Sequence, residues 1–194
     1  MPSGSITIAR YLSLDVRVTK YRMAREQART LARSGVYLAM QRLRNDADGH
    51  DWLQDDWAVS SWVVPYPAGG HMTIRIIDEE RKLSLNTAAQ SELAKLVGDD
   101  VMAQTIVDAW DEPNAAEDQP PYLAKNAPFV SPEELHDLPG MTPAQYETLR
   151  QFTSPHTSKE LNINTVAPEV LTAMGVESPI ATTFVQCREG REPF

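Results

Sequence analysis

The longest uninterrupted pattern in the sequence lies near its start, from residue 8 to about residue 43. Apolar side chains recur there at steps of three and four residues, and no proline follows before Pro65. About 35 residues in a helix make a rod of roughly 50 Å, because each residue rises 1.5 Å. A compact domain within a chain of 194 residues does not need so long a helix. We therefore expect its first half to project from the body.

Positive charge is concentrated in the same segment. Residues 1–44 carry a net charge of +7 and residues 45–194 a net charge of −16, which gives −9 overall. The overall balance disfavours a general binder of nucleic acid or of anionic membranes. Four arginines recur at helical spacing on a face of their own: Arg22, Arg25, Arg29 and Arg33.

Two strands and a series of short helices are predicted downstream. Residues 60–66 and 71–77 have strand character and are joined by a turn composition. Short helices follow, with starts set by capping residues and proline, as in Ser131-Pro132-Glu133-Glu134 and Thr142-Pro143. The polar segment 45–57 is expected to be a solvated loop.

The sequence contains neither an EF-hand nor a recognisable catalytic motif. An EF-hand in segment 45–57 fails because Arg44 would take the first ligand position, which needs a carboxylate. The histidines are scattered, and no catalytic or nucleotide-binding motif is present, so we do not expect an enzyme. The single cysteine, Cys187, is expected to be a small buried apolar residue.

The stretch ELHDLPGM, residues 134–141, resembles a helix-hairpin-helix turn. Such turns hold a nucleic-acid backbone through helix N-termini aided by basic side chains. Here the neighbours are acidic, and Arg150 is the nearest basic residue, so repulsion is expected to dominate. A DNA-binding or DNA-uptake protein is kept as the alternative function.

An acidic segment lies upstream of that turn. Six oxygen-bearing side chains fall within eleven positions, and Glu112 among them is expected to point to solvent. The candidate ligands are Asp108, Asp111, Asn114, Glu117 and Asp118. Carboxylates this close repel one another, and a calcium ion with its six to eight oxygen ligands would relieve the repulsion. The residues alone leave a solvated loop and a cation site as alternatives.

Three stretches, in this order, resemble one family. They are IRIIDEERKLSLNTA (74–88), IVDAWDEPNAAEDQPPYLAKNAPFVSPEELHDLPGM (106–141) and LNINTVAPEVLTAMG (161–175). Together they are similar to the K-type minor pseudopilins of bacterial type II secretion, and residues 35–46 resemble the end of that family's long helix. The implied fold is α+β: a pilin-like N-terminal helix and a small antiparallel sheet, with an inserted, mainly helical lobe. The corresponding parts are residues 6–86, the lobe 87–160 and a return segment 161–194 that lacks the family's closing strands.

The same resemblance implies a function. A K-type minor pseudopilin is a structural, non-catalytic component at the tip of the periplasmic pseudopilus, where it initiates assembly with I-type and J-type partners. No nucleic acid or small-molecule substrate is expected. The family binds calcium in its lobe, which favours a structural calcium ion at residues 108–118.

Contact with partners is expected to be helix against helix. An apolar face of the long helix is the predicted surface: Val18, Tyr21, Leu31, Gly35 and Leu38. Residues 1–5 look like an artificial leader. We expect the native protein to be anchored in the inner membrane by a hydrophobic helix start that this soluble piece lacks.

Overall fold

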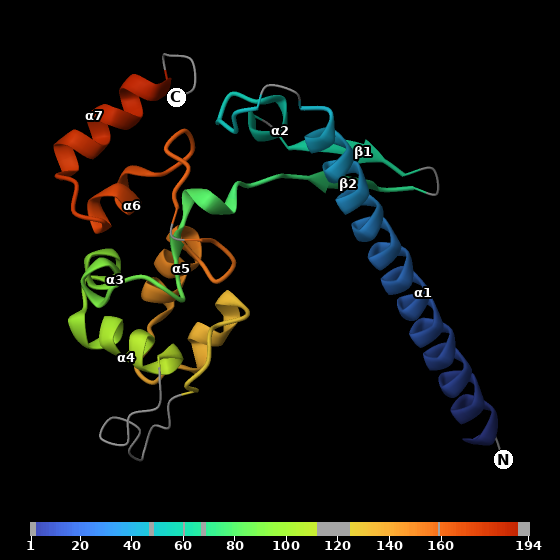
Figure 1. The fold of residues 1–194 in the computed structure, drawn as a ribbon. Helices are drawn as coiled ribbons and strands as arrows, with labels where there is room; N and C mark the ends of the chain where they lie inside the picture. The colour runs from blue at the N-terminus through green and yellow to red at the C-terminus, as the bar shows by residue number, and fades with distance from the viewer. Residues whose placement is uncertain are drawn as a thin grey trace. The chain divides into compact units, whose positions relative to one another are not determined.

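The computed structural model describes residues 3–46, 49–59, 61–66, 69–111, 125–158 and 160–189. The chain divides into two compact units, coloured from blue to red along the sequence in Figure 1. The first comprises residues 1–49 and 54–76, and the second comprises residues 50–53 and 77–194.

The first unit is a long helix with a β-hairpin packed near its C-terminal end (Figure 1). Strands β1 and β2 are antiparallel, with Trp62 opposite Ile74 and Pro65 opposite His71. A short helix follows the polar connection. The elements are α1 (Ser3–Arg44), α2 (Asp56–Val59), β1 (Trp62–Pro65) and β2 (His71–Ile74).

Gly35 lets the hairpin approach α1 closely. A Cβ atom on this buried residue would lie 2.8 Å from Sδ of Met72 and 3.6 Å from Cγ1 of Ile74. Leu31 and Ala39, one turn to either side, are half-buried on the same face. The residues of α1 before Leu31 whose side chains are described, from Leu14 onward, are all exposed. From Leu14 onward, burial within this unit therefore begins only in the second half of the helix.

The second unit is mainly helical. Its only paired strands among the described residues are β3 (Leu83–Ser84) and β4 (Thr153–Ser154), which run parallel. Ser154 also accepts a hydrogen bond from the backbone N–H of Leu85 at 2.9 Å. The helices are η1 (Glu79–Arg81), α3 (Gln90–Val97), α4 (Asp100–Trp110), η2 (Pro132–Asp137), α5 (Pro143–Phe152), α6 (Pro168–Ala173) and α7 (Ser178–Glu189).

One apolar core holds these short helices together. Residues from α3, α4, η2, α5 and α6 meet in it, and the largest fully buried side chains are Leu85, Leu93, Ile106, Leu135, Leu149, Val166 and Val170. The predicted starts are confirmed: Ser131 and Thr142 both form capping boxes, with Glu134 and Gln145 three residues later. The element after Ser131, however, is a 3₁₀ helix.

The α+β fold expected from the sequence is confirmed, with its long N-terminal helix, small antiparallel sheet and helical lobe. Segment 45–57 was wrongly expected to be solvated throughout, because Asp55 and Trp57 are buried and the Trp57 indole donates to Asp55 at 3.1 Å. Cys187 is exposed rather than buried. Among the described residues, no helix has both the length and the apolar character needed to cross a membrane.

Candidate functional site

The exposed side of α1 carries large apolar residues. Val18 is 40% exposed, Tyr21 71% and Leu38 36%, so these three predicted partner-binding residues are accessible within the first unit. An isolated exposed apolar side chain is ordinary, but several along one helix indicate a contact surface. Whether they bind a partner stays a prediction.

Two other predicted partner-binding residues are already used within the unit. Gly35 is buried beneath the hairpin and Leu31 is half-buried beside it. Gly35 in particular presents no surface to a second protein in this conformation. The accessible part of the predicted surface is therefore Val18, Tyr21 and Leu38.

The acidic segment begins at the end of α4. Asp108 is half-buried and accepts a hydrogen bond from Gln104 at 2.5 Å. Asp111 is the C-cap residue, and its backbone N–H donates to the carbonyl of Val107 at 3.1 Å. The other three predicted ligands, Asn114, Glu117 and Asp118, lie outside the described residues. The calcium site at residues 108–118 thus stays a prediction.

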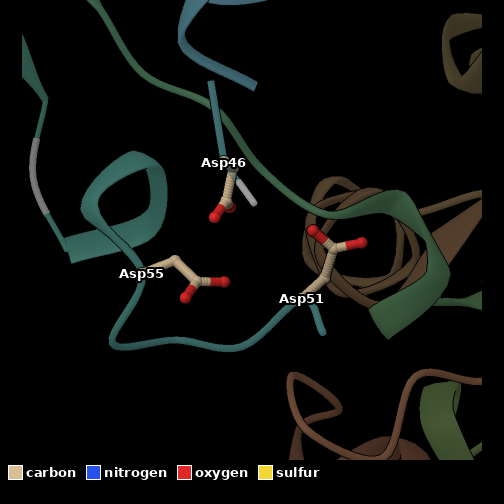
Figure 2. A group of neighbouring side chains, drawn as sticks. All are labelled: Asp46, Asp51 and Asp55. Atoms are coloured by element: carbon tan, nitrogen blue, oxygen red, sulfur yellow. The ribbon is translucent and has the colours of Figure 1, made fainter. Parts of the chain in front are cut away.

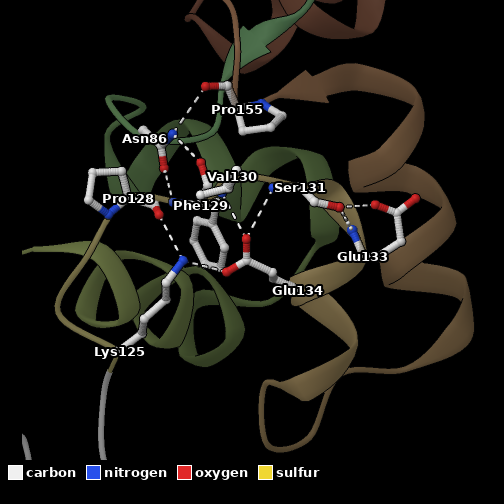
Figure 3. Close-up of polar contacts among 9 residues, drawn as sticks. All are labelled: Asn86, Lys125, Pro128, Phe129, Val130, Ser131, Glu133, Glu134 and Pro155. Carbon is white, nitrogen blue, oxygen red and sulfur yellow. Dashed lines mark hydrogen bonds and ion pairs between the residues drawn. The ribbon is translucent and has the colours of Figure 1, made fainter.

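Lys125, which follows the acidic segment, connects the chain to Pro128 and Glu134 (Figure 3). Its Nζ donates to the carbonyl of Pro128 at 2.8 Å and forms an ion pair with Glu134. The other carboxylate oxygen of Glu134 accepts from the backbone N–H groups of Val130 at 2.8 Å and Ser131 at 3.1 Å. The chain at Lys125 is therefore fixed to the N-terminus of η2.

These contacts change the acidity of Glu134. The hydrogen bond from Lys125, followed by that from the Val130 backbone, lowers the pKa of Glu134 below its ordinary value, because both favour the charged carboxylate. Glu134 therefore remains ionised under mildly acidic conditions, and its ion pair with Lys125 remains in place.

A second group of carboxylates lies after α1. Carboxylate oxygens of Asp46 and Asp55, both in the first unit, lie within 4.8 Å of each other. Figure 2 draws them with Asp51, which belongs to the second unit. Asp55 is buried and already accepts a hydrogen bond from the Trp57 indole, and this pair alone does not define a metal site.

The turn between η2 and α5 has the backbone of a tight hairpin. Gly140 has a φ of +83°, which favours glycine, and it packs near the methyl group of Met102. The N-terminus of α5 is closed by its own cap, because Thr142 accepts from the backbone N–H of Gln145 at 3.3 Å. Arg150 lies 3.6 Å from Glu147. The turn therefore offers neither a free helix N-terminus nor a free arginine to a phosphate.

The three sequence stretches behind the resemblance are tied together by polar contacts. The Asp78 carboxylate accepts from Asn162 at 3.0 Å and from Thr165 at 2.5 Å, joining the first stretch to the third. Asn86 joins the first stretch to the second by exchanging two hydrogen bonds with the backbone of Phe129, at 2.7 and 3.0 Å. These motif residues are structural ties of the second unit.

The region between Asp78 and Ser154 is bounded by these ties and by the pairing of β3 with β4. The family model described as "Type II secretion system (T2SS), protein K" matches residues 78–154. This segment is a type II secretion protein K domain. The predicted resemblance to the K-type family is thereby confirmed.

A solved structure agrees with this protein K assignment at the level of the fold. The chain is similar to one in the crystal structure of the GspK–GspI–GspJ complex of the type 2 secretion system from enterotoxigenic Escherichia coli. The TM-score is 0.66 at 20% sequence identity, and the match covers 84% of this chain and 71% of that chain. A comparison with curated proteins gives no significant match.

Several ties in and around the protein K domain were not predicted from the sequence. Lys125 belongs to no recognisable motif, and nothing in the sequence around it indicates that it pairs with Glu134, nine residues later. Asn86 and Asp78 belong to stretches noticed only for their resemblance. The capping-box spacing predicted the role of Glu134 at the start of η2, but it did not predict that the second carboxylate oxygen of Glu134 binds Lys125.

Proposed function

We propose that this chain is a structural component of the type II secretion pseudopilus, at its tip, where it initiates assembly. The protein K domain of residues 78–154 supports this assignment. The matched solved chain belongs to a GspK–GspI–GspJ complex, which favours I-type and J-type minor pseudopilins as partners. The body would lie in the periplasm, anchored to the inner membrane in the native protein. The proposed role requires no catalysis.

The observation that carries this proposal is the exposure of α1. From Leu14 onward, the helix packs within the first unit only through its second half, near Leu31, Gly35, Ala39 and Arg42. Val18 and Tyr21, which are large and apolar, stay exposed. A helix that served only to support the hairpin would gain nothing from these exposed side chains. Burial against a neighbouring helix would stabilise them by about 1.5–3 kcal/mol for each fully buried side chain.

Export by the host bacterium tests the role. The native gene carrying Val18→Glu and Tyr21→Glu should fail to restore secretion in a strain that lacks it, because two charges would be buried in the helix contact. A matched variant, Thr19→Glu with Gln27→Glu, adds the same charge to other exposed positions of α1 and should restore secretion. Full secretion with both variants, at normal protein levels, would contradict the proposal.

We also propose that residues 108–118 bind a structural calcium ion. Asp108 and Asp111 lie three residues apart where α4 ends, so both carboxylates are available at the start of the segment. Lys125, which follows the segment in the sequence, is held by the Pro128 carbonyl and by Glu134. An ion held between these ends would order the lobe and raise its stability by mass action.

The helix-hairpin-helix turn gives no support to the DNA-binding alternative. Its helix N-terminus is capped by Thr142, and the first turn of η2 holds Glu133 and Glu134. The hydrogen bond from Ser131 lowers the pKa of Glu133, which keeps its negative charge beside the turn. Phosphate would be repelled.

A further inference from the structure

A row of arginines on α1 is exposed and has no partner within the described part of the chain. Arg22, Arg25, Arg29 and Arg33 follow one another at steps of three and four residues, all exposed, and none forms an ion pair with a described residue. We call these four residues the arginine ladder. By contrast, Arg42 on the same helix lies over the Trp62 ring and 3.8 Å from Asp56.

The hairpin leaves the arginine ladder uncovered. The face of α1 that meets the hairpin contains Leu31, Gly35 and Ala39. Arg33 follows Leu31 by two residues and so points about 200° around the helix from it. Contacts within the first unit therefore do not account for four unpaired guanidinium groups on one stripe.

Apolar residues continue the same stripe beyond both ends of the ladder. Leu14 and Val18 precede it, and Val36 and Met40 follow it, all between 40% and 60% exposed. Between successive residues of the stripe, from Leu14 to Met40, the steps are four, four, three, four, four, three and four. This is an eleven-residue repeat, which keeps the side chains nearly in line along an α-helix. The stripe is about 39 Å long, with apolar ends and a basic centre.

We propose that this stripe binds a helix of a neighbouring pseudopilin whose facing side has carboxylates at its centre and apolar residues at its ends. The inference rests on the proposed function. Guanidinium groups bind carboxylates through paired hydrogen bonds. Such pairs attract the two helices and also fix their register. The apolar ends would bury against their counterparts and exclude water around the charged centre.

Two other anionic partners fit the stripe less well. A membrane surface needs one continuous apolar face opposite a basic one, whereas here apolar and basic residues share a single stripe. A nucleic acid offers no apolar surface to match Leu14, Val18, Val36 and Met40, and the net charge of −9 opposes it. A partner helix can offer carboxylates to the basic centre and apolar side chains to the apolar ends.

Charge reversal at the ladder tests the inference. The probes are the soluble domains of the I-type and J-type pseudopilins from the same secretion system. Arg25→Glu with Arg29→Glu should weaken the complex about tenfold or more, since attraction becomes repulsion at the centre of the contact. Arg17→Glu with Lys20→Glu makes the same change of charge at exposed positions off the stripe and should alter the dissociation constant by less than about threefold. The wild-type complex should weaken as salt is added.

Each other outcome has a definite meaning. Equal effects of the two double variants would overturn the inference but leave the proposed function standing. No complex with the wild-type chain would overturn the proposed function and this inference with it. Loss of binding to phosphatidylglycerol vesicles or to duplex DNA, with pseudopilin binding intact, would assign the ladder to that other partner. If the reversal variant unfolds, Arg25→Gln with Arg29→Gln repeats the test, and an unchanged complex then overturns the inference.

Discussion

Asn86 and Phe129, 43 residues apart in the sequence, exchange two hydrogen bonds as paired strands do. The Asn86 side chain accepts from the Phe129 backbone N–H at 2.7 Å and donates to its carbonyl at 3.0 Å, while the same amide nitrogen donates to the Pro155 carbonyl at 3.1 Å. One side chain thus joins three segments of the second unit, as Figure 3 shows.

Replacing Asn86 by alanine should therefore destabilise the second unit strongly. Three backbone groups would lose their partner, and each partly buried group left unsatisfied costs about 1–3 kcal/mol. We expect urea unfolding to report a loss of about 3 kcal/mol or more. Asn45→Ala, an exposed asparagine at the end of α1, is the control and should change the free energy of unfolding by less than about 0.5 kcal/mol. A similar small effect at both positions would contradict the role given to Asn86.

Gly35→Leu should destabilise the first unit by about 1–3 kcal/mol, because the added side chain must displace Met72 and the hairpin. Gly35→Ala should be far milder, since alanine favours the helix by about 1 kcal/mol and only the flexible Met72 thioether must move. Thermal unfolding followed by circular dichroism measures both. Ala32→Leu, at an exposed position of the same helix, is the control and should be nearly neutral.

The stability of the second unit should fall in acid partly through Glu134. Its pKa is lowered in the folded state, so its contribution is fully present above the ordinary glutamate value of 4.5 and is lost as the pH falls through the folded pKa. Glu134→Gln should lower stability at pH 7 and flatten this acid dependence. Urea midpoints between pH 7 and pH 3 measure it, with the exposed Glu160→Gln as control. An acid dependence identical to that of the wild type would contradict the assignment.

Calcium should raise the thermal midpoint of the second unit by about 10 °C at a free concentration a hundredfold above its dissociation constant. Magnesium should do much less, because it requires a strict small octahedron. Asp111→Ala should lose most of the gain, whereas Asp137→Ala, on η2, should keep it. The Trp110 indole N–H, one residue before Asp111, is buried without a partner among the described residues. Equal thermal midpoints in calcium and in chelator would contradict the calcium site and favour a solvated loop at residues 108–118.

Local patterns predicted the elements well where local physics determines them. Helix α1, the strands of the hairpin and the caps at Ser131 and Thr142 follow from periodicity and short-range hydrogen bonds. The parallel pairing of Leu83–Ser84 with Thr153–Ser154 depends on contacts 70 residues apart, which no local pattern encodes.

The partner-binding surface of α1 was predicted only in part, because burial by the hairpin is a long-range contact. Helical spacing placed the arginines of α1 on a face of their own, whereas Val18 and Val36 share their stripe. It also could not tell which face the hairpin would cover. Burial of Gly35 became evident only from the contact with Met72. Exposure of Cys187 likewise depends on α7 packing by one face, through Ala181 and Arg188, which are buried.

The most direct test of the account is whether this chain forms a complex with the I-type and J-type pseudopilin domains of its own secretion system. Native mass spectrometry of the three purified proteins, mixed at micromolar concentration, measures it. We predict one species that contains all three chains. This species should be lost with Val18→Glu and Tyr21→Glu but kept with Thr19→Glu and Gln27→Glu. Three separate folded proteins in the wild-type mixture would contradict it.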